Sequence, residues 1–336
     1  MLPNRKNSQR LLTGLLLASA AASHAADGNT PQFYGTINLS LDNENYGGVE
    51  KVQDQWSLNS NNSRIGVRHT IALQNGLNAV LKAEFRINTD DGRESDGQTI
   101  SQRDIYAGFS GHYGQLIAGR FNTPLRTSEG KLDLFNHLHG DIDAVLGGQN
   151  RADNIIQYTS PEFSAIRVNA AFIPGENKDT DGDGDPDHNI ADAFSFSAVY
   201  NHNNLYAAAA LDRNQPAGTT VDGLNRSDRI QLAAGWTLNN TRIAAIAQQA
   251  HDTDNSALKE KAAVFNLSQR VHNTTLKAQY GVNKGDFSGE KRTLKAIGAD
   301  YQLDKSAYLF AAWSTLTEQQ SHHTDRVFSL GFNQSF

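Results

Sequence analysis

Five aspartates stand at alternate positions in one polar stretch, an arrangement that can offer oxygen ligands to a hard cation. With Gly184 in sixth place, the run resembles the first half of an EF-hand calcium loop. The twelfth position holds Ile190 in place of the usual bidentate glutamate, and a frame starting at Asp181 puts Pro186 where glycine is needed. Two interpretations stay open: a calcium site of modest affinity, or a solvated acidic loop that attracts cations diffusely. The five aspartates are Asp179, Asp181, Asp183, Asp185 and Asp187.

Other residue patterns do not favour catalysis. His137 and His139 are two apart and His322 and His323 are adjacent, and neither spacing matches a zinc-enzyme motif. The chain has no cysteine, which excludes a thiol nucleophile and thiolate zinc ligands. Gly-x-Ser-x-Gly, His-Glu-x-x-His and P-loop motifs are also missing from the sequence. We therefore predict that the protein is not an enzyme and has no cofactor beyond the possible calcium ion.

The N-terminus has the order of a secretory signal peptide. Arg5, Lys6 and Arg10 precede the short apolar run 11–22, and Ala25 ends a small-residue cleavage site. We predict a signal peptide at 1–25 and a single domain at 26–336. The full chain carries a net charge of −6, and loss of the three cations makes the mature chain more acidic, which argues against nucleic acid as a partner.

Alternation with a period of two residues is the main structural signal. In the segment 77–88, Leu77, Leu81 and Phe85 share one parity, and Lys82 and Arg86 share the other. This pattern predicts β-strands with one apolar and one polar face. Alternation alone fits a soluble sandwich, whose apolar face meets a core, and a membrane barrel, whose apolar face meets lipid.

The lengths of the connections separate these two folds. Seven short polar turns alternate with eight longer polar loops along the chain, the longest being 121–150. Outer-membrane barrels have short periplasmic turns and long external loops, whereas a sandwich has no reason to sort its connections in this way. The sequence therefore predicts an all-β fold, a 16-stranded antiparallel transmembrane β-barrel. Arg68, Lys82 and Arg86 have the polar parity of their strands, so we expect them to line the lumen.

Several segments in order resemble the trimeric general diffusion porins of the Gram-negative outer membrane, over nearly the whole mature chain. No single segment is specific, but their order, their spacing and the terminal aromatic residue Phe336 together are. The segments are Ser63–Val67, Leu81–Phe85, Asp104–Phe109, Tyr113–Arg120, Ile155–Pro161 and Gly331–Phe336.

The resemblance implies that the third loop folds into the lumen and narrows the channel. An arginine cluster on the wall then faces an acidic segment of the loop, and this chain has a histidine where many members of the family have a glutamate. Because histidine titrates near neutral pH, the charge of the constriction depends on that residue. Arg120 shares the parity of Leu116, so it faces the lumen only if its strand ends or bulges there. The implied constriction residues are Arg64, Arg120, Arg151, Asp133, His137, Asp141 and Asp143.

The resemblance predicts a passive channel for ions and small hydrophilic solutes in the cell outer membrane. The alternatives are a substrate-selective channel for a sugar or organic anion, and a barrel enzyme or adhesin. The partners implied are outer-membrane lipid, two further copies of the chain in a homotrimer, and the barrel-assembly machinery, which reads the terminal Phe336.

Overall fold

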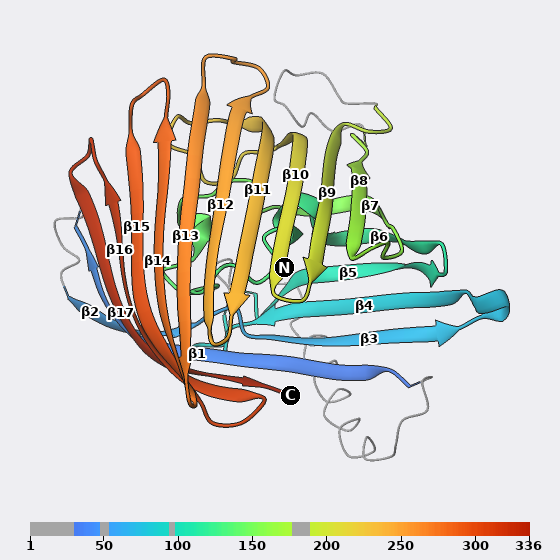
Figure 1. The fold of residues 1–336 in the computed structure, drawn as a ribbon, viewed down its shortest axis with the longest axis horizontal. Helices are drawn as coiled ribbons and strands as arrows, with labels where there is room; N and C mark the ends of the chain where they lie inside the picture. The colour runs from blue at the N-terminus through green and yellow to red at the C-terminus, as the bar shows by residue number, and fades with distance from the viewer. Residues whose placement is uncertain (1–29, 48–53, 94–97, 177–188) are drawn as a thin grey trace, which may run out of the picture.

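The computed structural model describes residues 30–47, 54–93, 98–176 and 189–336. The signal peptide predicted at 1–25 and the aspartate run 179–187 lie outside these residues. The described chain forms one antiparallel sheet (Figure 1). Its strands are β1 (Gln32–Tyr46), β2 (Gln55–Ser60), β3 (Arg64–Ala72), β4 (Asn78–Ile87), β5 (Ile100–Gly111), β6 (Gly114–Asn122), β7 (Arg151–Thr159), β8 (Ile166–Ile173), β9 (Ala193–His202), β10 (Leu205–Pro216), β11 (Arg226–Leu238), β12 (Thr241–Asp252), β13 (Lys259–Val271), β14 (Thr274–Gly285), β15 (Lys291–Gln302), β16 (Ala307–Glu318) and β17 (His323–Ser335).

Strands β2 and β3 together occupy one position in the barrel. Strand β1 pairs with β2 along its second half and with β3 along its first half. The break falls at Asn61–Ser63, where Asn62 has a φ of 61°. Counting β2 and β3 as one strand gives 16 positions, which confirms the predicted strand number.

Pairing of the first and last strands closes the sheet. Strand β1 pairs with β17 from Thr36 opposite Ser335 onward. Beyond them, the backbone N–H of Gly35 donates to the Phe336 carbonyl at 3.0 Å, and the reverse bond measures 3.1 Å. A Cβ on Gly35 would lie 2.3 Å from Cζ of the Phe336 ring, so the ring lies directly over this glycine. Figure 1 shows the C-terminus beside β1. Closure leaves no free edge, as a membrane barrel requires.

The exposure of side chains on the two faces of the strands shows that the apolar face points outward. On β11, Ile230 and Leu232 are 63% and 58% exposed, whereas Gln231 and Ala233, which alternate with them, are buried. A soluble sandwich would bury the large apolar side chains instead. An outward apolar face with polar and small residues inside is the arrangement of a barrel in lipid. None of the described helices is long and apolar enough to cross a membrane.

The third long loop, which we call L3 (residues 123–150), lies inside the barrel. It begins with α2 (Pro124–Thr127), capped by the Thr123 side chain, and contains the 3₁₀ turn η2 (Ile142–Ala144). One side of L3 is apolar and packs on small and aliphatic side chains of the inner wall from β10 to β15. This contact is the largest hydrophobic cluster of the described chain, and it confirms the predicted in-folding of the loop. The cluster contains Leu132, Ile142, Val145 and Leu146 from L3, with Ala208, Ala233, Ala244, Ile246, Ala262, Val264 and Leu294 from the wall.

Glycines and amide side chains of that wall fit L3 closely. A Cβ on Gly281 would lie 2.7 Å from Val145 Cγ2, and one on Gly298 would lie 2.9 Å from Phe135 Cε1. Amide side chains on four successive strands donate to backbone carbonyls of L3, which have no partners in a strand ladder. The bonds run from Gln231 to Leu125 (3.3 Å), Gln248 to Gly147 (3.0 Å), Asn266 to Leu132 (2.6 Å) and Gln279 to Gly140 (2.6 Å).

Candidate functional site

The opposite wall of the barrel, from β3 to β7, carries a cluster of cations around two carboxylates. Glu84 on β4 is buried and accepts a hydrogen bond from Arg103 Nε at 2.7 Å. Lys82 Nζ lies 3.5 Å and Arg64 Nε 3.9 Å from the same carboxylate. The hydroxyl of Tyr34 donates to its Oε2 at 2.9 Å. One buried carboxylate is therefore shared among three cations.

The second carboxylate, Asp104 on β5, is held by two cations. Its oxygens lie 2.7 Å from Lys82 Nζ and 2.8 Å from Arg151 Nε. The register of β4 and β5 shifts between Ala83 and Phe85, so that two residues of β5 oppose the single residue Glu84. Such a bulge lets adjacent residues turn to the same face of a sheet. Both Arg103 and Asp104 thus reach the charged cluster in the lumen.

The tip of L3 meets this cluster through His137 and Asn62. The amide nitrogen of Asn62 lies 2.8 Å from Nε2 of His137, and its amide oxygen accepts from Arg86 and Arg103. Burial and the nearby arginines, above all Arg103 and Arg64, lower the pKa of His137 to about 3. The neutral ring is also the form that accepts a hydrogen bond from an amide. The expectation that His137 titrates near neutral pH is therefore wrong.

Acidic residues of L3 gather close to that tip. Asp141 accepts from the backbone N–H of His137 at 2.6 Å and of Asp143 at 2.9 Å. Burial raises the pKa of Asp133, and burial together with the nearby Asp133 carboxylate raises that of Asp141, each to about 7. Burial and the charge of Asp141 raise the pKa of Glu129 to about 7 as well. The side chain of Asp143 is accessible to water inside the barrel, and desolvation by the surrounding protein together with the charge of Asp141 raises its pKa to about 7.

No ion pair among the described residues joins these loop acids to the arginines of the wall. The described ion pairs of Arg64 and Arg151 go to Glu84 and Asp104 instead. The predicted loop segment and two of the predicted arginines are thus brought to one region of the lumen. Their contact runs through His137 and Asn62, not through carboxylate–guanidinium pairs.

Comparison with known proteins agrees with this architecture. The family described as Gram-negative porin matches residues 12–320. The chain belongs to this family. A Neisseria meningitidis serogroup A major outer membrane protein P.IB is 24% identical over 91% of this chain and 93% of its own length. A solved anion-selective porin from Comamonas acidovorans has a TM-score of 0.79 at 20% identity, covering 92% of this chain and 100% of that one. The trimer form of Vibrio cholerae OmpT has a TM-score of 0.64 at 17% identity, covering 92% and 100%.

The porin spans the outer membrane as a multi-pass β-barrel and is a diffusion channel for small solutes. Its relatives are channels, not enzymes. In this setting the charged wall and the tip of L3 are the candidate constriction.

Arg120 does not lie in the cationic cluster of this porin, contrary to the prediction. It pairs in register with Ile105 on β5, which in turn pairs with Ala83 on the apolar face of β4. A bulge does occur at this point, but it lies between β6 and β7. The Arg120 guanidinium bonds to Asp153, which is 64% exposed. The family motif gave the residue type at this position but not the direction of the side chain.

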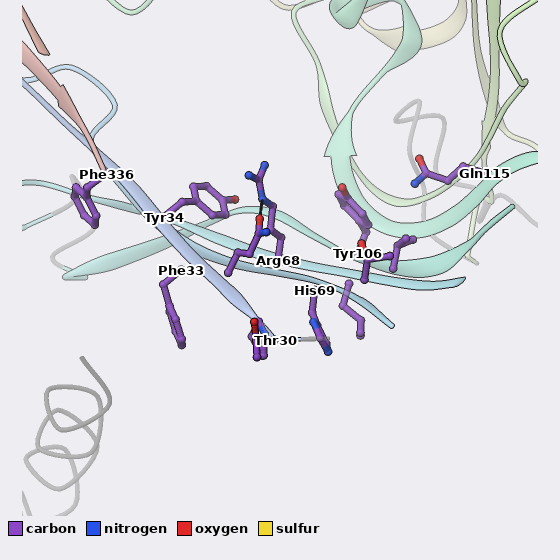
Figure 2. Close-up of a pocket in the computed structure, with 13 residues that line it drawn as sticks. Thr30, Phe33, Tyr34, Arg68, His69, Tyr106, Gln115 and Phe336 are labelled. Carbon is purple, nitrogen blue, oxygen red and sulfur yellow. Dashed lines mark hydrogen bonds between the residues drawn. The ribbon is translucent and has the colours of Figure 1, made fainter. Parts of the chain in front are cut away.

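Arg68 lies in a recess of about 1030 Å³, together with residues of β1, β4 and β5 (Figure 2). Its Nε donates to Gln32 Oε1 at 3.0 Å, and its guanidinium lies 5.5 Å from the centre of the Tyr34 ring. Figure 2 shows Tyr34 and Tyr106 in the same recess. Arg68 is thus outside the narrow region, whereas Lys82 and Arg86, predicted only as lumen-lining, take part in it.

Four charged residues of the site were not assigned from the sequence. Glu84 has the polar parity of its strand, a signal that was sufficient to place it in the lumen. Asp104 shares the parity of the lumen-facing Tyr106, whereas Arg103 has the parity of the outward-facing Ile105 and reaches the lumen through a bulge that nothing in the local sequence marks. Arg126, in the first turn of L3, donates to the carbonyl of Gln149 at 2.7 Å and fixes the two ends of the loop together.

Proposed function

We propose that the constriction of this porin favours anions. The observation that carries the proposal is the excess of cations over carboxylates on the charged wall and its adjoining loop end. The carboxylates Glu84 and Asp104 are buried or half-buried and are already shared among several cations. The acids of L3 have raised pKa values, so each carries less than a full negative charge near pH 7. The cations are Arg64, Lys82, Arg86, Arg103, Arg126 and Arg151.

The physical argument is electrostatic. A passage lined by one sign of charge between walls of low dielectric raises the local concentration of the opposite ion. Fixed guanidinium groups keep their charge at any physiological pH, whereas the carboxyls of the loop are partly protonated. Small hydrophilic anions should therefore enter the narrow region more readily than cations of similar size. The anion selectivity named for the Comamonas porin supports the same assignment.

The test is the reversal potential of the purified porin in a planar bilayer separating two KCl concentrations. Its sign should report a preference for chloride. Arg103→Gln should move the potential toward potassium, because Glu84 then loses its closest cation. Arg167→Gln is a matched control, since Arg167 pairs with the exposed Glu162 beside a short turn and should leave the potential unchanged. A potassium preference in the wild-type channel would refute the proposal.

We also propose that the porin works as a homotrimer, as the trimer form of Vibrio cholerae OmpT suggests. The mass of the detergent-solubilised complex, measured by light scattering with the detergent contribution subtracted, should equal three chains. Current steps in multiples of three would agree with it. A monomeric mass with full channel activity would contradict the proposal.

The terminal aromatic residue supports a third proposal, recognition by the barrel-assembly machinery. Phe336 ends the strand that closes the barrel, and its ring is 67% exposed and available to a partner. Deleting it should lower the amount of porin inserted in cells. Refolding of the purified deletion variant in detergent separates the two roles, because a loss of closure would impair refolding as well. If the Phe336 deletion variant reaches the outer membrane at the wild-type level, the assembly machinery does not recognise this residue.

A further inference from the structure

Three side chains that can bind a metal meet at a second place in the lumen, between β1 and L3. Nε2 of His139 lies 3.7 Å from Oδ2 of Asp42 and 3.5 Å from Oε1 of Glu44. One ligand atom from each of the three residues lies within 4.8 Å of the other two. Asp42 and Glu44 are two positions apart on β1, so the period of the strand places them on one face. His139 reaches them from a loop almost 100 positions further along the chain.

The two buried carboxylates share a single basic partner. The side chains of Asp42 and Glu44 are 1% and 6% exposed, and His139 is their sole basic partner among the described residues. The second oxygen of Asp42, Oδ1, is buried and makes no hydrogen bond in the described chain. Buried carboxylates side by side are unfavourable unless a positive charge compensates them. This contrasts with Glu84 and Asp104, which contact three and two cations.

Polar neighbours on β2 hold the carboxylates in place. Asn59 Nδ2 donates to Asp42 Oδ2 at 2.7 Å and to Glu44 Oε1 at 2.9 Å. Ser57 and Gln55 each donate to Glu44 at 2.8 Å. Hydrogen-bonded neighbours that orient the ligand oxygens are a regular feature of protein metal sites.

We propose that Asp42, Glu44 and His139 bind a divalent transition-metal ion of the Zn²⁺ class. Zinc bonds of about 2.0–2.2 Å put neighbouring ligand atoms of a tetrahedral site about 3.3–3.6 Å apart. The two measured separations, 3.5 and 3.7 Å, match this spacing with little movement. An imidazole with two carboxylates suits zinc, whereas calcium and magnesium prefer ligand sets made of oxygen alone.

The site is open to the channel on one side. His139 is 33% exposed, which gives the ion a route from the lumen and leaves a fourth coordination position for water. A bound ion would join L3 directly to β1, a strand that contributes no side chain to the apolar clusters on which the loop packs. The inference goes beyond diffusion of solutes, because it makes the porin a metal-binding protein whose loop position responds to the ion.

Isothermal titration calorimetry tests the proposal on tag-free porin in detergent with ZnCl₂ as the probe. We expect one Zn²⁺ per chain. Loss of a neighbour that orients a ligand typically weakens metal binding by about 10–100-fold, so His139→Gln and Asp42→Asn should each weaken it by at least about tenfold. His251→Gln is the matched control, because His251 lies 3.6 Å from the single carboxylate Asp228 and should leave the affinity unchanged.

His139→Gln changes a half-exposed loop residue, and its single-channel conductance in the absence of zinc reports whether the channel is intact. Zinc should alter the current of the wild-type channel and leave that of His139→Gln unaffected. Wild-type zinc affinity in His139→Gln would overturn the proposal, as would an equal loss in His251→Gln.

Discussion

The two halves of the inner wall have opposite chemistry. From β10 to β16 the wall offers L3 mainly alanines, glycines and neutral amides, and the loop packs on it with its apolar side chains. Two cations of this half also contact the loop: Arg242 donates to the Lys131 carbonyl at 2.8 Å, and Lys277 lies 4.7 Å from the centre of the Phe135 ring. From β3 to β7 the wall offers arginines, a lysine and two carboxylates, and it meets L3 mainly at His137. The first half fixes the position of the loop through burial and hydrogen bonds. The second half carries the charges of the proposed constriction, so we expect separate residues to determine the position of the loop and the selectivity of the channel.

The strongest effect on the channel should come from removing the largest apolar side chain that holds L3 against the wall. Phe135 is 1% exposed and packs between Ala296 and Ala312. Phe135→Ala should cost about 3–5 kcal/mol of docking energy, because it removes a buried ring and leaves a cavity. The loop would then leave the wall part of the time, so the conductance should become larger and noisier.

The control for this prediction is Phe265→Ala. Phe265 is 59% exposed on the outer face of β13 and has no contact with L3 through the described clusters. Its loss should leave single-channel conductance unchanged. Equal conductance in wild type and Phe135→Ala would show that packing on this half of the wall does not position the loop.

Substitutions in the charged half of the wall should change the ion selectivity of the channel and leave the position of L3 unchanged. Asp104→Asn removes a carboxylate held by Lys82 and Arg151 and leaves both cations uncompensated. A unit charge acting at 4 Å through water contributes about 1 kcal/mol, so the anion-to-cation permeability ratio should rise by up to about fivefold in dilute KCl. The shift should shrink at 1 M salt, where screening acts over about 3 Å. An unchanged reversal potential with normal conductance would place Asp104 away from the passage.

The sequence predicted the barrel well and the constriction only in part. Alternation and connection lengths are local signals, and they gave all 16 strand positions, whereas the in-folding of the third loop was implied by the family resemblance. The direction of Arg103 depends on a bulge that no local residue marks, and that of Arg120 on pairing with Ile105. The amide bonds from Gln248 and Gln279 to L3 join residues about 100 or more positions apart, so no sequence window contains both partners.

The anion preference of the channel should depend on pH, with a smaller effect than that of Asp104→Asn. Burial raises the pKa of Glu129 and of Asp133 to about 7, so both lose negative charge as pH falls from 8 to 6. Anion preference should therefore increase over this range. The pKa values of these carboxyls are higher in the folded protein than in the unfolded chain, so folding takes up protons. The free energy of unfolding should therefore decrease as pH rises from about 4 to 7. The charged groups that act on them are Arg126, Asp141 and Asp143.

The double variant Glu129→Gln/Asp133→Asn should reduce the pH dependence of the reversal potential. The change should be less than the fivefold limit for Asp104→Asn, because both groups are partly protonated at pH 7 and sit in the loop instead of beside the wall cations. His137 should not contribute above pH 5, since its pKa is lowered to about 3. A pH response that persists unchanged in the double variant would assign it to other groups.

The smallest effect is expected at Arg120, and it tests where the charged half of the wall ends. Its guanidinium pairs with the exposed Asp153, and its strand partner Ile105 belongs to the apolar outer face. Exposed ion pairs contribute about 0–1 kcal/mol, so Arg120→Ala should change stability little. Its reversal potential should equal that of the wild type at low and high salt, in contrast to Arg103→Gln. A shift as large as that of Arg103→Gln would mean that the side chain reaches the lumen in the membrane, and the charged half would then extend to β6.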